Sequence, residues 1–118
     1  MKKILVIGSL NMDYSIRLDR TPKLGETIKA NGYIKSEGGK GANQAYTIGK
    51  LGGNISMIGA VGNDNNGNML KENLKSVGVN ISGIETVQNE QTGTAFIMVD
   101  KIGNNSIMII EGANRKSR

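Results

Sequence analysis

Residues 37–53 read EGGKGANQAYTIGKLGG, and this stretch decides how the rest of the chain is interpreted. It begins with three glycines around a single lysine, Lys40, and continues at once into a helix-forming run. Glycine is the poorest ordinary helix former, so glycines at a helix start indicate a place where a side chain would be in the way. The pair Gly52 and Gly53 supplies the left-handed turn that ends a helix. We therefore predict a helix over 41–51 whose first backbone N–H groups are open to a ligand.

Short apolar runs on both sides of this helix predict a parallel sheet. The run KILVIG (3–8) is continuous and apolar, which favours a buried central strand covered on both faces. NISMIGAVG (54–62) has the same character. The segment 63–78 repeats apolar residues at helical spacing and ends in glycine, and it leads into a third strand over 79–87. The order strand, helix, strand, helix, strand implies parallel strands joined by right-handed crossovers.

Four further segments alternate apolar and polar residues, or flank a short turn, and do not belong to this sheet. They are residues 12–18, 27–36, 92–100 and 106–112. We expect them to form a small separate sheet at one end of the molecule, in the position of a lid. The predicted fold class is α/β, a parallel sheet with helices on both faces plus a small β-sheet lid.

The composition argues against several classes of function. The 118 residues suffice for one small domain, and no apolar run approaches the roughly 20 residues that cross a bilayer, which favours a cytoplasmic protein without a membrane partner. Cysteine and histidine are both absent, so a disulfide framework, a zinc site and an imidazole base are not expected. The net charge of +5 raises nucleic-acid binding as an alternative. The lysines are scattered and aromatic residues are few, so we interpret the charge as a solvated surface and expect no nucleic-acid partner.

The candidate site lies where the first strand and the helix start meet. In parallel α/β sheets, ligands bind beyond the carboxyl ends of the strands, near helix N-termini. GSLNMD (8–13) follows the first strand and contains Asn11 and Asp13, while GGKGAN (38–43) precedes the helix. Backbone donors, amides, a carboxylate acceptor and a lysine together suit a polyhydroxy ligand such as a sugar. The alternative is an ordinary tight turn with solvated charges, and neither the P-loop nor the dinucleotide motif fits this segment.

Several segments in order resemble one known family. GSLNMD and GGKGANQA, followed by GAVGNDNNG (59–67), TGTAFIMVD (92–100) and EGAN (111–114), are similar to the ribokinase-like branch of the PfkB carbohydrate kinase family. KLGET (23–27) resembles the family's PGET-like segment. The resemblance covers essentially the whole chain, and GGKGANQA is its most specific part. Members of this family are more than twice as long as this chain.

The resemblance implies ATP-dependent phosphorylation of the 5-hydroxyl of ribose, with Mg²⁺ as a second cofactor. It implies apolar lid contacts from Ala95 and Ile97, and a homodimer formed through the lid strands. It also implies a set of residues that contact the sugar by side chain or backbone. That set is Asn11, Asp13, Gly38, Gly39, Lys40 and Asn43.

The resemblance also assigns part of the chemistry to a region that does not match these residues. The family's catalytic base is the aspartate of a Gly-Ala-Gly-Asp segment, which this sequence does not contain; the residues that bind ATP and magnesium are also not among those here. The acidic residues Asp19, Asp64 and Asp100 read as turn or cap residues. We therefore expect these 118 residues to carry the sugar-binding half and the lid, and not to phosphorylate sugar by themselves. Two alternatives stay open: a kinase for another sugar or a nucleoside, and a non-catalytic module that binds sugar or forms dimers.

Overall fold

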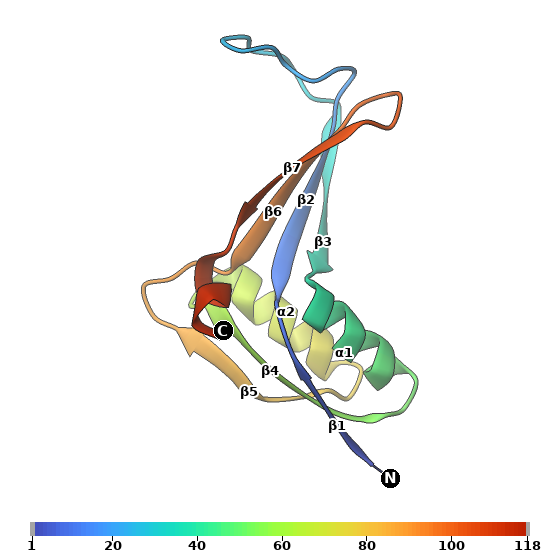
Figure 1. The fold of residues 1–118 in the computed structure, drawn as a ribbon, viewed down its shortest axis with the longest axis vertical. Helices are drawn as coiled ribbons and strands as arrows, with labels where there is room; N and C mark the ends of the chain where they lie inside the picture. The colour runs from blue at the N-terminus through green and yellow to red at the C-terminus, as the bar shows by residue number, and fades with distance from the viewer. Residues whose placement is uncertain (1, 118) are drawn as a thin grey trace.

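The computed structural model describes residues 2–117 and contains two sheets and two α-helices (Figure 1). The first sheet is parallel, with strand order β1-β4-β5. Its strands are β1 (Lys3–Ile7), β4 (Asn54–Gly62) and β5 (Asn80–Val87), and the helices are α1 (Lys40–Lys50) and α2 (Asn65–Lys75). This order confirms the predicted strand-helix alternation.

A second sheet projects from this α/β layer, so that the molecule extends over 53 × 32 × 21 Å (Figure 1). Its strand order is β3-β2-β6-β7, with β2 and β6 parallel and the outer pairs antiparallel. The strands are β2 (Asn11–Arg17), β3 (Gly32–Gly38), β6 (Gly93–Val99) and β7 (Asn105–Ile110), followed by the 3₁₀ helix η1 (Gly112–Ser117). The separate sheet expected from the alternating segments is confirmed.

The apolar core lies between the parallel sheet and the two helices. Helix α1 buries only small residues there, because its backbone approaches the end of β1 closely: a Cβ on Gly41 would lie 2.7 Å from the Cα of Gly8. Gly52 and Gly78 follow the two helices with positive φ, as the sequence predicts. The core side chains are Val6, Leu10, Met12, Ala42, Ala45, Ile55, Met57, Val61, Leu70, Leu74, Val79 and Ile84.

The prediction of a buried central strand over 3–8 is wrong. Within residues 2–117, strand β1 lies at the edge of the parallel sheet and pairs only with β4, and the side chains of Leu5 and Ile7 are 55% and 64% exposed. Only Val6 of this strand is buried. An apolar run indicates that both faces of a strand can be covered, but it does not indicate which strands become its neighbours.

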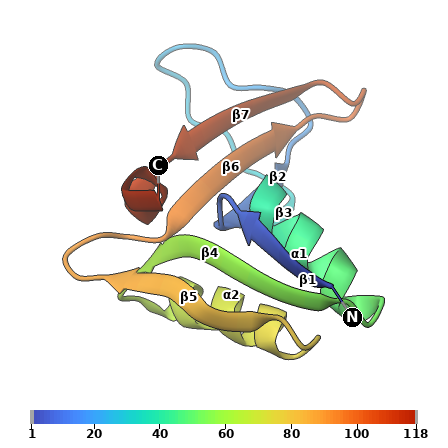
Figure 2. The same ribbon diagram turned by 60° about the horizontal axis from the view of Figure 1, so that its bottom comes forward.

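We predicted helices on both faces of the parallel sheet. Within residues 2–117, α-helices cover only one face. Both α-helices pack against the face that Val6 and Met57 present, and the opposite face, which includes Ile7, is contacted by η1 (Figure 2). No helix in the described part of the chain is long and apolar enough to cross a membrane. The cytoplasmic location stays a prediction.

The strand predicted over 27–36 is shifted toward the C-terminus in the structure. Strand β3 begins only at Gly32, because β2 ends at Arg17 and these two residues are the last pair of the ladder. The segment between them is a loop, closed by side-chain hydrogen bonds such as that from Asn31 Nδ2 to Asp19 Oδ1 at 3.0 Å.

The acidic residues expected in caps and turns lie there. The carboxylate of Asp64 accepts the Gly67 N–H in the first turn of α2, and Asp100 Oδ1 accepts two N–H groups of the β6–β7 turn.

Candidate sugar-binding site

The site begins where the chain passes from the parallel sheet to the second sheet. Residues 8–10 make this passage, and the start of α1 lies against them: the Ala42 N–H donates to Ser9 O at 3.0 Å. Gly39 precedes the helix with φ of +96°, and a Cβ there would lie 2.5 Å from Ser9 O. Glycine is required here by backbone conformation and by close approach. A side chain would thus be in the way here because of the chain's own backbone, and the Ala42 N–H is already used by Ser9. The approach of a ligand to this helix start stays a prediction.

The carboxylate of Asp13 lies directly against the backbone of Gly38. A Cβ at that glycine would overlap the Asp13 Oδ2 and would lie 2.6 Å from Cγ. Asn11 and Gly38 face each other across the β2–β3 ladder, and Asp13 lies two residues further along β2 on the same face. The structure thus brings the predicted carboxylate to the predicted glycine segment.

Asp13 makes no hydrogen bond or ion pair with another side chain or backbone group in residues 2–117. Partial burial raises the pKa of its carboxyl group above the ordinary value, because water is removed from the charged form. A half-buried carboxylate without internal donors gains most from a ligand that brings hydroxyl hydrogens.

The neighbouring strand of the second sheet adds apolar surface beside this carboxylate. Ala95 of β6 is paired in register with Asp13, and Ile97 is paired with Ser15. Because side chains alternate along a strand, these residues share one face of the sheet. Ala95 is buried and Ile97 is half-buried. The predicted lid residues therefore lie on the same sheet face as Asp13.

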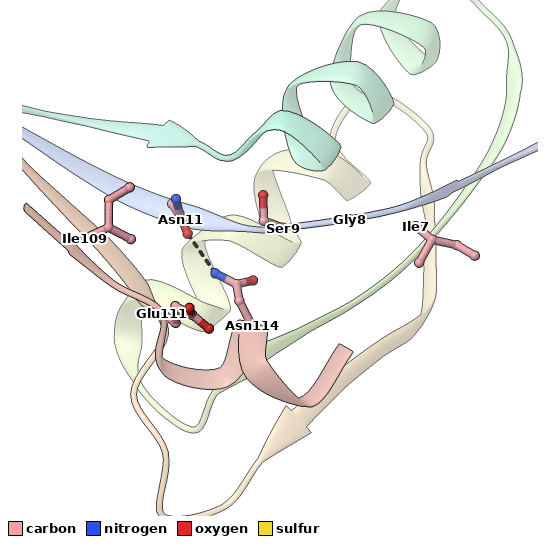
Figure 3. Close-up of a pocket in the computed structure, with 7 residues that line it drawn as sticks. All are labelled: Ile7, Gly8, Ser9, Asn11, Ile109, Glu111 and Asn114. Atoms are coloured by element: carbon pink, nitrogen blue, oxygen red, sulfur yellow. Dashed lines mark hydrogen bonds between the residues drawn. The ribbon is translucent and has the colours of Figure 1, made fainter. Parts of the chain in front are cut away.

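A cavity of about 420 Å³ opens beside this face, between the end of β1, the start of β2 and the β7–η1 connection (Figure 3). Among the predicted residues, only Asn11 lines it. The cavity is lined by Ile7, Gly8, Ser9, Asn11, Ile109, Glu111 and Asn114.

Six of these seven lining residues were missed from the sequence, and for four of them a signal can be named. Ile109 pairs in register with Ala95, so the alternation of β6 and β7 was a signal that could have found it. Glu111 and Asn114 belong to the EGAN segment, which was noted only as part of a resemblance. Ser9 lies within GSLNMD, where only the amide and the carboxylate were considered.

Of the seven predicted residues that do not line this cavity, two have exposed side chains. Lys40 is the first residue of α1 and its side chain is exposed. Asn43 is also exposed and lines two other hollows, one with Glu37 and Tyr46 and another with Thr47. The backbone N–H of Asn43 already donates a hydrogen bond to Gly39 O. The start of α1 has no side-chain cap.

The described residues do not fit the cofactors that the resemblance implies. Within residues 2–117, no group of three or more acidic, cysteine or histidine side chains could hold a metal ion. The glycine segment at the start of α1 also lacks the spacing of a P-loop.

Comparison with known proteins defines the family. The family described as pfkB family carbohydrate kinase matches residues 1–118, so the chain belongs to this family and the resemblance is confirmed. The ribokinase of Bacillus subtilis (strain 168) is 42% identical over 114 residues, which are 97% of this chain and 39% of that protein. The chain spans less than two fifths of the length of the first curated relatives it matches.

Solved structures show the same relationship in three dimensions. The structure of Arabidopsis thaliana ribokinase complexed with ribose and ATP matches with a TM-score of 0.87 at 41% identity, covering 93% of this chain and 36% of that one. The nucleoside kinase of Methanocaldococcus jannaschii, described as an archaeal member of the ribokinase family, matches with a TM-score of 0.89 at 32% identity. It covers 96% of this chain and 38% of that chain. The ribokinase-like fold class is therefore confirmed.

Proposed function

We propose that these residues form the sugar-binding part of an ATP-dependent ribose kinase, which phosphorylates the 5-hydroxyl of D-ribose. The observation that supports this most is the Asp13 carboxylate, held against Gly38 without an internal hydrogen-bond donor. Its neighbours are a buried alanine and a cavity lined by Asn11. The likeness to ribokinases at about 40% identity supports the same proposal.

Each predicted residue has a role in this proposal. Asp13 accepts hydrogen bonds from two neighbouring sugar hydroxyls, and Asn11 adds a directional amide contact. Gly38 and Gly39 let the ligand approach the backbone, while Lys40 and Asn43 complete the polar rim on the helix side. Ala95 and Ile97 cover the sugar. The second sheet then acts as a lid, which excludes water during phosphoryl transfer.

ATP and Mg²⁺ belong to the whole kinase in this proposal. The Arabidopsis ribokinase structure contains ATP, and residues 2–117 hold no group of three or more acidic, cysteine or histidine side chains that could bind a metal ion. The prediction that residues 1–118 alone do not phosphorylate ribose is checked by incubating them with ATP, Mg²⁺ and ribose and measuring ribose 5-phosphate. Product formation at a rate above that of a protein-free control would contradict it.

Titration of the 118-residue chain with D-ribose by calorimetry tests the binding proposal. We expect saturable binding that Asp13→Ala weakens at least tenfold, because the ring hydroxyls lose their acceptor. The matched control is Asp19→Ala, which removes an exposed carboxylate in the loop between β2 and β3. Equal affinity of the wild-type chain and Asp13→Ala would overturn the role of Asp13, and absence of binding by the wild-type chain would overturn the proposal for these residues.

A nucleoside is the second candidate substrate. The nucleoside kinase noted above has the same fold over these residues, and a nucleoside carries the same ribose hydroxyls as the free sugar. Parallel titrations with ribose, fructose and adenosine distinguish the candidates. Tighter binding of adenosine than of ribose would favour the nucleoside, and tighter binding of fructose would favour a different sugar.

We also propose that the second sheet joins two copies of the chain. Its outer strands leave Tyr33, Ile34 and Ile107 more than half exposed, which is unusual for apolar side chains of one sheet. Sedimentation equilibrium is expected to show a dimer that Ile107→Glu dissociates, because a charge would be buried in the interface. Ile102→Glu, in the exposed β6–β7 turn, is the control, and a monomeric wild-type chain would contradict this proposal. A dimer that binds sugar without kinase activity would favour the non-catalytic module.

A further inference from the structure

Asn114 lies 104 residues along the chain from Leu10, and its side chain nevertheless pairs with the backbone of that residue. The Leu10 N–H donates to Asn114 Oδ1 at 3.0 Å, and Asn114 Nδ2 donates to Leu10 O at 3.0 Å. A backbone N–H can only donate and a carbonyl can only accept, so these two bonds determine which end of the Asn114 amide is oxygen and which is nitrogen.

The second hydrogen of Asn114 Nδ2 points at the side chain of Asn11. The two atoms, Asn114 Nδ2 and Asn11 Oδ1, are 2.7 Å apart (Figure 3). Since Asn114 donates here, Asn11 must present its oxygen to Asn114 and its nitrogen away from it. Figure 3 shows the Asn11 nitrogen turned away from Asn114. The orientation of the Asn11 amide therefore follows from the backbone of Leu10 through Asn114.

The surrounding structure holds Asn114 in place and keeps room for this contact. Ala113 is fully buried and its N–H donates to Gln91 O at 2.8 Å, which seats η1 against the start of β6. Gly93 stands opposite Asn11 in the β2–β6 ladder. A Cβ on Gly93 would overlap Asn114 Nδ2 and lie 2.5 Å from Asn11 Oδ1. Glycine at this position leaves the space in which the two amides meet.

We propose that Asn114 is a positioning residue that makes Asn11 a hydrogen-bond donor toward the ligand. This role rests on the proposed function. At the site, Asn11 then offers N–H groups to the ligand and Asp13 offers acceptor oxygens. A sugar hydroxyl meets both, because its oxygen accepts from Asn11 and its hydrogen is donated to Asp13. If the Asn11 amide were reversed, two acceptors would stand side by side and the site would favour a ligand with donors only.

Two measurements test this proposal, and the first needs no ligand. In the isotopically labelled 118-residue chain, NMR is expected to detect scalar coupling through the hydrogen bond between Asn114 Nδ2 and Asn11 Cγ. The signals of Asn11 are assigned by their loss in Asn11→Ala. Absence of this coupling, with the Asn114 side-chain hydrogens exchanging as fast as those of exposed asparagines, would overturn the proposal.

The second measurement is a double-mutant cycle read by ribose calorimetry. Asn114→Asp retains an acceptor for the Leu10 N–H, but it also turns an acceptor toward Asn11. The Asn11 amide would then no longer be held with its nitrogen toward the ligand, so we expect at least tenfold weaker ribose binding. In an Asn11→Ala background the same substitution is expected to change affinity less than twofold, because Asn114 acts through Asn11. Asn63→Asp, which changes an asparagine bonded to Gln88 away from the cavity, is the matched control with less than a twofold effect.

The outcomes separate this proposal from the proposed function. Absence of ribose binding by the wild-type chain would remove the proposed function for these residues, while the NMR coupling would still decide the orientation of Asn11. Ribose binding that Asn114→Asp leaves unchanged, or weakens equally with and without the Asn11 side chain, would overturn the positioning role alone. If Asn114→Asp fails to fold, the coupling in the wild-type chain decides the question.

Discussion

The two ends of the second sheet use glycine for different reasons. At the end where β2 starts and β3 stops, here called the base, a Cβ on Gly38 or Gly93 would overlap a neighbouring side chain. At the other end, here called the tip, a Cβ on Gly25 or Gly103 would have no heavy atom within 4 Å. The base glycines are required by what lies next to them, whereas the tip glycines serve only the positive φ of their turns.

The polar contacts of the two ends differ in the same way. The base is held by half-buried and buried hydrogen bonds between distant elements, such as those of Asp64 with Thr92 and of Asn114 with Leu10. The tip is held by exposed pairs such as Arg20 with Glu26. The difference shows that the position of the second sheet, and with it the candidate site, is determined at the base. Substitutions that disturb these contacts should therefore have larger effects at the base than at the tip.

Gly41→Ala is expected to have the largest effect, lowering the free energy of unfolding by about 3 kcal/mol. The added Cβ would meet the backbone of Gly8 at 2.7 Å, and backbone atoms cannot rotate away. In an unobstructed helix the same substitution stabilises by about 0.5–1 kcal/mol, so even the sign is a test. Urea denaturation measures it. Gly103→Ala at the tip is the control and should cost about 1–2 kcal/mol, from its left-handed backbone alone.

Asp64→Asn is expected to cost about 2 kcal/mol at pH 7. Asp64 Oδ2 accepts the Thr92 N–H at 2.9 Å, and an amide nitrogen placed there would oppose one donor with another. An effect no larger than that of Asp19→Asn, which alters an exposed carboxylate at the tip, would show that the base is not held by this network.

The same residue predicts a pH dependence. Desolvation raises the pKa of Asp64, but hydrogen bonds from Thr92 and Gly67 outweigh it, so the pKa lies below the ordinary 3.8. A carboxyl group with a lowered pKa in the folded state contributes stability above its unfolded pKa and loses it as the pH falls through the folded value. The difference between the wild-type chain and Asp64→Asn should therefore shrink below about pH 4. Thermal unfolding between about pH 7 and pH 2 measures this, and a constant difference would contradict it.

Much of the fold could be predicted because its signals are local. The alternation of Met12, Tyr14 and Ile16 identified β2, and the glycines after both helices identified where they end. Strand neighbours are not local, which is why β1 was wrongly placed at the centre of its sheet. The start of β3 depends on the pairing of Gly32 with Arg17 across a long loop, and the sequence pattern alone does not show this pairing.

The candidate site divides in the same manner. Asn11, Asp13 and the glycine segment could be predicted as candidates because they follow directly after a strand or precede a helix, where ligands of parallel sheets bind. Asn114 was missed because its role depends on contacts with Leu10 and Asn11, which only the folded chain brings together. The amide of a residue in a short 3₁₀ helix has no sequence signal for such a role.

Gly38→Ala should affect ligand binding more than folding. The added Cβ would displace the Asp13 carboxylate, which is a side chain and can rotate away, unlike the backbone that faces Gly41. We expect at least tenfold weaker ribose binding with about 1 kcal/mol of destabilisation, measured by calorimetry and urea denaturation. Gly103→Ala again serves as the control for binding. Unchanged affinity in Gly38→Ala would place the ligand away from Asp13.

Glu26→Gln at the tip should have the smallest effect. Two hydrogen bonds from Arg20 and one from the Lys23 N–H lower the pKa of Glu26 to about 2, yet all of these groups are exposed to water. Water replaces such contacts when they are lost, and exposed ion pairs contribute little to stability. The urea midpoint and the affinity for ribose should both stay unchanged within error. A large loss of either would show that the tip, and not only the base, determines where the second sheet lies.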